Sequence, residues 1–287
     1  MGNNEKRKPS YQDILIAEKR VQDETQITFV KWFEKFKEII NLFFEISYLK
    51  RNHSINVTSS EYSFYWYAKD IYTEIPCSLR SCSLHLETGY YTNALDSCRA
   101  LLETLVKLKY FFNHKDSISP FFNTGKDEHG KKIKIKTFFE KATPIAYEKN
   151  YSFLCKFVHK DVFTSLPSLV SRLNSHVKKT SNQEAFLPLP TFSKSLAEIV
   201  IKHLLALISG YLNAVSHFFS YELTESDSAF LATYENLKKW VNNFIQANKV
   251  NFPNSKEWSE LMEEIAEEPQ PMRTNESPQP KDLSQLI

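Results

Sequence analysis

Apolar residues recur at intervals of three and four positions along most of the chain, which is the spacing of one buried face of an α-helix. The alternating pattern of a half-buried β-strand is confined to the short run "KIKIK", which we interpret as an extended loop. The chain is therefore predicted to fold as an all-α multi-helix bundle. The predicted helices lie at about 11–50, 60–88, 92–112, from 137, across 147–163, 193–221, 224–247 and after Asn254.

Proline, glycine and threonine mark the expected helix ends. Pro76 lies inside the second predicted helix and should kink or split it, because proline lacks the backbone donor and clashes with the preceding turn. Gly89 is expected to end that helix. The sequence "GYYT" then predicts a tight connection between antiparallel helices, with Thr92 as the N-cap of the second one.

The composition along the chain predicts one domain with loose ends. Residues 1–10 are polar and are expected to be flexible, whereas 11–268 should form a single helical bundle domain. An irregular, lysine-rich loop is predicted at 114–136. Residues 269–287 are rich in proline and polar side chains, which predicts a disordered tail. Its apolar end, "LSQLI", could dock on a partner protein or simply fray.

The overall composition narrows the class of protein. Five glycines in 287 residues favour helices over sheet folds, which use glycine in tight turns. A net charge of +2 gives no general electrostatic case for nucleic-acid binding, so any such case depends on a local patch. Four cysteines without metal-site spacing predict free thiols in a reducing compartment, with no metal and no cofactor. The apolar run at 199–215 is interrupted by Lys202 and His203, so we expect a cytoplasmic protein without a membrane partner.

The helix predicted at 92–112 carries a candidate polar pair beside its apolar stripe. Arg99 and Glu103 are one helical turn apart, at an edge that a second helix would partly cover. They form either a surface ion pair or one half of a polar site. The stripe itself consists of Leu95, Cys98, Leu101, Leu102, Leu105 and Val106.

Histidines on two later helices are further candidates. His159 lies beside the apolar face of "YEKNYSFLCKFVHKDVF", where it is either a boundary residue or part of a polar seam suited to proton transfer. His203, Gly210 and His217 recur at seven-residue steps. The two histidines are about 21 Å apart along a helix, too far to share a metal. Gly210 should let another helix approach closely.

Two short patterns point to nucleic acid. "RSCSLH" places Arg80 and His85 at the short Arg-x4-His spacing of HEPN-type ribonucleases, although roughly 0.6 matches with four to six residues between Arg and His are expected by chance in this composition. Five lysines of the loop predicted at 114–136 could bind phosphate groups, or the loop could simply be solvated. These lysines are Lys126, Lys131, Lys132, Lys134 and Lys136.

The segment "LETGYYTNALDSCRALLETLVKL" resembles the helix of HEPN-like proteins in which a short turn precedes an Ala- and Leu-rich helix with a buried Glu. The run "RALLE", followed some fifty residues later by "YSFLCKFVH", is also similar to a group of bacterial all-helical proteins. Those carry an Arg-x-x-x-Glu helix and a later Tyr…Ser/Cys…His helix, and relatives of this type occur among abortive-infection and phage-defence genes. The resemblance covers about residues 76–163.

This resemblance implies a HEPN-like bundle that often dimerises and in some members cleaves RNA without a metal. It carries over Arg99, Glu103 and His159, with histidine as acid/base or as the group that orients the 2′-hydroxyl, and arginine stabilising the phosphorane. In the HEPN nucleases the Arg–His motif usually lies later in the bundle than the Gly-Tyr turn, whereas Arg80 and His85 precede that turn here.

The sequence thus favours a HEPN-like helical effector of bacterial defence or toxin type, acting on RNA as a metal-independent endoribonuclease. We expect a homo-oligomer, such as a dimer. The alternative is a non-catalytic helical module that regulates or binds a partner protein through its aromatic surface or tail. A third class, a small-molecule sensor that uses the aromatic-lined interior of the bundle, is also open.

Overall fold

The structure is a computed structural model that describes residues 10–49, 58–142, 151, 154–155, 190–224 and 226–247. These residues are almost entirely helical, and they contain no β-strand beyond one isolated bridge between Lys126 and Lys132. The predicted all-α fold is therefore confirmed. The elements are α1 (Tyr11–Thr28), α2 (Val30–Tyr48), α3 (Ser59–Glu87), α4 (Tyr91–Asn113), the 3₁₀ turn η1 (Lys115–Ser117), α5 (Ile118–Thr124), α6 (Ile135–Ala142), α10 (Lys194–Phe218), α11 (Ser220–Thr224) and α12 (Ser228–Ala247).

Some predictions concern residues outside these ranges. They are the flexible start before Ser10, most of the helix predicted at 147–163 with its His159, the helix after Asn254, and the tail at 269–287.

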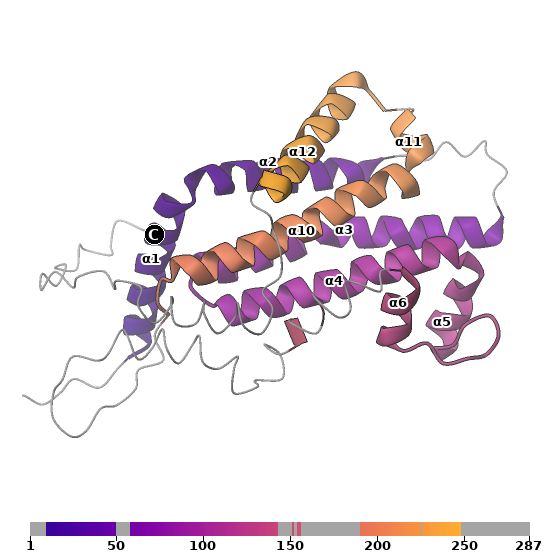
Figure 1. Cartoon of the computed structure of the whole chain (residues 1–287), viewed down its shortest axis with the longest axis horizontal. Helices are drawn as coiled ribbons and strands as arrows, with labels where there is room; N and C mark the ends of the chain where they lie inside the picture. Colours follow the sequence, from indigo (N-terminus) through magenta and orange to yellow (C-terminus); the bar gives the residue numbers. More distant parts are fainter. Residues whose placement is uncertain are drawn as a thin grey trace, which may run out of the picture.

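Four long helices lie side by side along the long axis of the molecule (Figure 1). Helix α3 packs against both α2 and α4, and α10 packs against α4 and α12. Helix α1 meets α3 at the end of the bundle where the α3–α4 turn lies, whereas α5 and α6 lie beside the opposite end of α4 (Figure 1). The two ends of the bundle are thus built from different elements.

Buried tyrosines tie the long helices together through their hydroxyl groups. Tyr72 on α3 donates to the Tyr211 carbonyl on α10, and Tyr211 donates to the Leu101 carbonyl on α4, both at 2.7 Å. Tyr234 on α12 donates to the Leu212 carbonyl, also at 2.7 Å. Each bond satisfies a buried hydroxyl with the second lone pair of a helical carbonyl. The aromatic core therefore contains fixed polar links between helices as well as apolar packing.

The helix boundaries correct several predictions. The helical stretch predicted from Tyr11 to about Lys50 is divided at Phe29 into α1 and α2. Thr58 caps α3 through reciprocal bonds with Glu61, at 3.2 and 3.1 Å, so that α3 begins one residue before the predicted start at 60. Helix α3 continues through Pro76, so the split does not occur, because packing on both sides of α3 supports the interrupted backbone.

Two glycines permit close approaches. Gly89 adopts φ +81° in the α3–α4 turn, where a Cβ atom would lie 3.0 Å from the Thr191 carbonyl oxygen. Gly210 lies where α10 crosses α4, and a Cβ atom there would lie 2.5 Å from Cδ2 of Leu105. The predicted close approach at Gly210 is therefore confirmed. Helix α4 begins at Tyr91 after Tyr90, so Thr92 is not its N-cap.

The region predicted as a loop at 114–136 is partly helical, since it contains η1, α5 and the start of α6. Its irregular part is a hairpin-like loop closed by a hydrogen bond in which the Ile133 N–H donates to the Gly125 carbonyl at 3.1 Å. In the helical part of the region, Phe121 on α5 packs against Phe111 on α4, with the ring centroids 5.3 Å apart.

Helix α10 is, among the described residues, the helix whose length and hydropathy would suit a membrane span. However, 67% of its most apolar window is buried inside the bundle. A core helix meets the same criteria, so this finding is weak support for a membrane role.

Candidate functional site

Arg99 and Glu103 lie at the boundary between core and solvent, as the helical projection predicted. Their side chains are 24% and 23% exposed, and Nη1 of Arg99 lies 3.6 Å from Oε1 of Glu103. Nε of Arg99 also donates to Asp96 at 3.3 Å. The arginine thus bridges two carboxylates on the exposed side of α4, without being sealed from water.

Two side chains from the later segment meet this pair. The pKa of Arg99 is lowered by burial but raised more by the charge of Glu103 and a hydrogen bond with Cys155, and the result lies above its ordinary value. The pKa of Tyr151 is raised by burial, by hydrogen bonds with Cys155 and Glu103, and by the charge of Glu103. We call Arg99, Glu103, Tyr151 and Cys155 the α4 cluster. It joins the two sequence segments that the family resemblance paired.

None of the three candidate histidines, His159, His203 and His217, is seen in the α4 cluster among the described residues. His159 lies outside the described residues. In the sequence it follows Cys155 by four residues, the same interval by which Cys155 follows Tyr151. His203 is buried and its Nδ1 lies 2.8 Å from the Ile199 carbonyl oxygen; burial, aided by the charge of Lys202, lowers its pKa to about 4. His203 is therefore a neutral core residue, whereas His217 is exposed.

Arg80 and His85 are not brought together among the described residues. Five residues on an α-helix separate two side chains by about 140°, so they point to different sides of α3. Arg80 binds Glu87, and the Nδ1 atom of His85 is buried without a hydrogen-bond partner among the described residues. The Arg-x4-His spacing therefore does not form a joint arginine–histidine site here.

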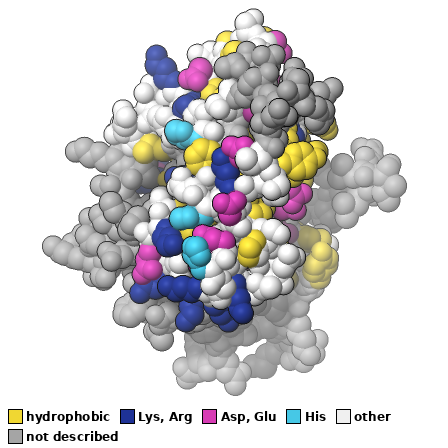
Figure 2. Space-filling model, turned by 90° about the vertical axis from the view of Figure 1, so that its right-hand side faces the viewer, with side chains coloured by type: hydrophobic (Ala, Val, Ile, Leu, Met, Phe, Trp, Pro, Cys, Tyr) yellow, Lys and Arg dark blue, Asp and Glu magenta, His cyan; other side chains and the backbone are white. Residues whose placement is uncertain are grey.

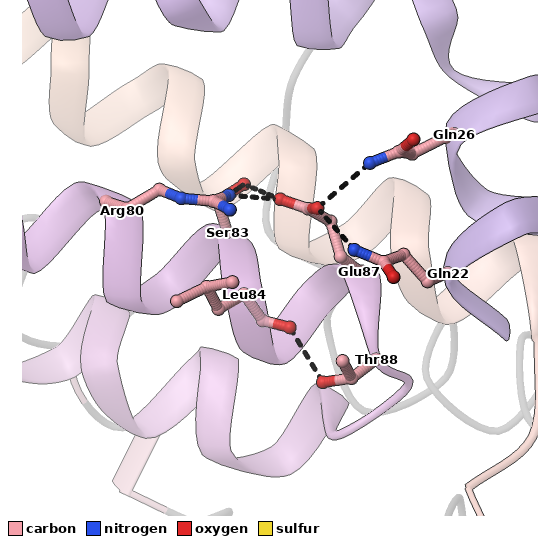
Figure 3. A network of polar contacts seen from close by, with 7 residues as sticks. All are labelled: Gln22, Gln26, Arg80, Ser83, Leu84, Glu87 and Thr88. Atoms are coloured by element: carbon pink, nitrogen blue, oxygen red, sulfur yellow. Dashed lines mark hydrogen bonds and ion pairs between the residues drawn. The ribbon is translucent and has the colours of Figure 1, made fainter. Parts of the chain in front are cut away.

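Glu87, which the sequence analysis did not single out, lies at the centre of a polar network between α1 and α3 (Figure 3). It is only 2% exposed. Its Oε1 accepts from the Arg80 guanidinium and from the Ser83 hydroxyl, the latter at 2.8 Å. Its Oε2 accepts from Gln26 at 3.2 Å and Gln22 at 3.5 Å, both across from α1 (Figure 3). The network joins α1 to the end of α3.

Glu87 is ionised at neutral pH. Burial raises the pKa of its carboxyl group, but hydrogen bonds from Ser83, Arg80 and Gln26 and the charge of Arg80 bring that pKa below its usual value. The network lines a pocket of about 480 Å³, which we call the Glu87 pocket. Its other walls include Val30, Phe33 and Ile40.

The sequence contained a signal for this network. Arg80, Ser83 and Glu87 are separated by three and four residues, which places all three on one face of α3. The contribution of α1 could not be read in the same way, because contacts between helices are not encoded in spacing along one helix.

The lysine-rich turn is exposed at one end of the bundle. Lys126, Lys131, Lys132, Lys134 and Lys136 are all exposed. Figure 2 shows Lys and Arg side chains gathered at the bottom of this end of the molecule. Lys136 pairs with Glu140 at 3.5 Å, and no ion pair with the other four lysines occurs among the described residues. With one aspartate and one glutamate in 126–136, the turn carries a formal charge of +3.

Comparison of the chain with protein-family models, curated proteins and solved structures finds no match. The fold and the geometry of the side chains therefore carry the functional argument alone. Among the described residues, no group of three or more His, Cys, Asp or Glu side chains could hold a metal ion.

Proposed function

We propose that this chain is a HEPN-like helical effector that acts on RNA as a metal-independent endoribonuclease, with the α4 cluster as its polar site. The observation that carries the proposal is the meeting of Tyr151 and Cys155 with Arg99 and Glu103. A bacterial defence or toxin role is part of the same proposal and rests on the family resemblance.

The chemistry divides among the side chains as follows. The 2′-hydroxyl of a nucleotide attacks the adjacent phosphorus while the bond to the 5′-oxygen breaks, leaving a 2′,3′-cyclic phosphate and a 5′-hydroxyl. His159 takes the proton from the 2′-hydroxyl and returns it to the leaving oxygen. Arg99, a permanent cation, stabilises the charge on the phosphorane, and Glu103 holds Arg99 in position.

The exposed lysine turn supports the same proposal as a contact for the RNA backbone. The turn comes after η1 and α5, which follow α4, and the C-terminal end of α4 lies about 21 Å along that helix from Arg99. Four of the turn's lysines have no carboxylate partner in the described part of the chain, and such a cationic patch attracts phosphates and should make RNA binding depend on salt.

Cleavage is tested with labelled single-stranded RNA in the presence of EDTA. Wild-type protein should produce fragments ending in cyclic phosphate, and Arg99→Ala and His159→Ala should each reduce the rate at saturating RNA by about 100-fold or more. Arg20→Ala on α1 serves as the matched control, because this arginine also contacts a glutamate one helical turn away, at 3.8 Å. It should leave the rate unchanged.

Binding is tested separately by fluorescence anisotropy. Replacing Lys131, Lys132 and Lys134 with alanine should weaken RNA binding and reduce its salt dependence, whereas replacing the exposed Lys19, Lys31 and Lys239 should not. Absence of cleavage by the wild-type protein would overturn the proposal and leave the non-catalytic interaction module.

A further inference from the structure

The Glu87 pocket combines a buried charge with unequal hydrogen bonding of its two oxygens. Oε1 is bound by a guanidinium and a hydroxyl, both from α3 itself. Among the described residues, Oε2 receives only the two glutamine contacts, at 3.2 and 3.5 Å, which lie at and beyond the long end of the usual range. A buried carboxylate oxygen gains most from a short, direct donor, so Oε2 is the position at which a ligand group would be stabilised.

The glutamines are suited to give way to such a group or to bind it. Gln26 is exposed and Gln22 is half-buried, so each can move without disturbing the core. Each amide also offers a carbonyl acceptor as well as its N–H donors. The polar side of the pocket can therefore present acceptors and donors close together, next to a fixed negative charge.

The remaining walls are apolar, and the volume suits a small organic molecule. Val30, Phe33 and Ile40 on α2 face the polar side of the pocket, and Val30 is 51% exposed. A volume of about 480 Å³ falls in the range of small-molecule sites. A flat or compact apolar ring can thus cover these side chains while its edge meets Glu87.

The charges favour a neutral ligand. The pocket is lined by two acidic side chains, Glu34 and Glu87, and by two basic ones, Lys37 and Arg80. A cation placed at Oε2 would lie beside Arg80, and an anion would be repelled by the Glu87 charge. An aromatic amino group is uncharged and can donate a hydrogen bond to a carboxylate or to the oxygen of a glutamine amide. Side chains of these types accept hydrogen bonds from the amino groups of adenine and cytosine in protein–DNA complexes.

We propose that the Glu87 pocket binds an amino-substituted nucleobase, with the exocyclic amino group donating to Oε2 of Glu87 and the ring covering Val30 and Ile40. The base could belong to a free nucleoside or nucleotide, or to an unpaired residue of RNA. This site is separate from the α4 cluster, so it does not depend on RNA cleavage.

The test is titration of the full-length protein with nucleosides, followed by ligand-observed NMR or calorimetry. Adenosine and cytidine should bind, and inosine and uridine, which lack the amino group, should bind about tenfold or more weakly. Comparison of adenosine monophosphate with a short adenine-containing RNA oligonucleotide, both on the variant with Lys131, Lys132 and Lys134 replaced by alanine, then distinguishes a free ligand from a base within RNA. Tighter binding by the oligonucleotide assigns the site to RNA, and equal or weaker binding assigns it to the free ligand.

Variants locate the binding. Glu87→Gln should reduce adenosine affinity about tenfold. Gln26→Ala should also change adenosine affinity, and because Gln26 is exposed this variant should remain folded. Gln246→Ala, an exposed glutamine on α12, is the matched control and should have no effect. The proposal is overturned if no nucleoside binds at millimolar concentration, if inosine and uridine bind as well as adenosine and cytidine, or if Gln26→Ala behaves like Gln246→Ala.

Discussion

Helices α3 and α4 each carry an arginine–glutamate pair, and the two pairs differ in spacing, burial and partners. Arg80 and Glu87 are seven residues apart, and the Glu87 side chain is 3% exposed. Arg99 and Glu103 are four residues apart, and both side chains are about one quarter exposed. Glu87 also receives donors from a second helix, whereas the charged partners of Arg99 lie on α4 itself.

The comparison shows that spacing along a helix predicts an ion pair better than it predicts the importance of that pair. A four-residue interval produces a contact on any helix, but water weakens the contact when both partners are exposed. A carboxylate that is almost fully buried must be satisfied by the protein, so its donors become structural links. We therefore expect Glu87 to matter for stability and Glu103 chiefly for the chemistry of the α4 cluster.

Alanine substitution of the two glutamates should give the largest difference. Glu87→Ala removes the acceptor shared by Arg80, Ser83 and Gln26, so the free energy of unfolding should fall by about 2 kcal/mol. Glu103→Ala should cost about 0.5 kcal/mol, because its partner stays in contact with water. Urea denaturation measures both losses in unfolding free energy, provided that the dependence of this free energy on urea concentration is the same in the variants as in the wild type. Equal losses would contradict the contrast between the two pairs.

The pH dependence of stability should come partly from Glu87. Its pKa in the folded protein lies below the usual value of 4.5, so its carboxylate stabilises the fold above pH 4.5. That contribution disappears as the pH falls through the folded pKa. The stability difference between wild type and Glu87→Gln should therefore shrink below pH 4.5. Urea midpoints measured from neutral to acidic pH check this, and a difference that stays constant or grows on acidification would rule it out.

Double-mutant cycles should give the smallest effect. The coupling between Arg80 and Glu87 should be about 1 kcal/mol, reduced by the half exposure of Arg80, whereas that between Arg99 and Glu103 should be about 0.3 kcal/mol. High salt should abolish the second coupling and leave most of the first. A larger coupling on α4 than on α3 would reverse the order that burial predicts.

Much of the fold could be predicted from the sequence because helical periodicity records which face is buried. The apolar stripe around Leu105 and the role of Gly210 are both contained in the spacing on a single helix. The break at Phe29 and the continuity of α3 through Pro76 could not be predicted in this way. They depend on which neighbouring helices support the backbone, and that information is not local.

In the candidate sites, too, spacing along one helix could be predicted and contacts between helices could not. Arg99 and Glu103 were found because they lie beside a regular apolar stripe, and their meeting with Tyr151 required the folded structure. Glu87 lies in the last turn of α3 and resembles an ordinary polar helix end in the sequence. Its burial results from α1 packing over it, which brings Gln22 and Gln26 to the carboxylate.

The most direct test of the proposed function compares the two arginines in one RNA-cleavage assay, with EDTA present and RNA saturating. Arg99→Ala should lose about 100-fold or more in rate, because the phosphorane loses its cation. Arg80→Ala, whose guanidinium is committed to Glu87, should stay within about threefold of the wild-type rate. Loss of cleavage in Arg80→Ala with wild-type activity in Arg99→Ala, or no cleavage by the wild-type protein, would contradict the assignment of the α4 cluster as the active site.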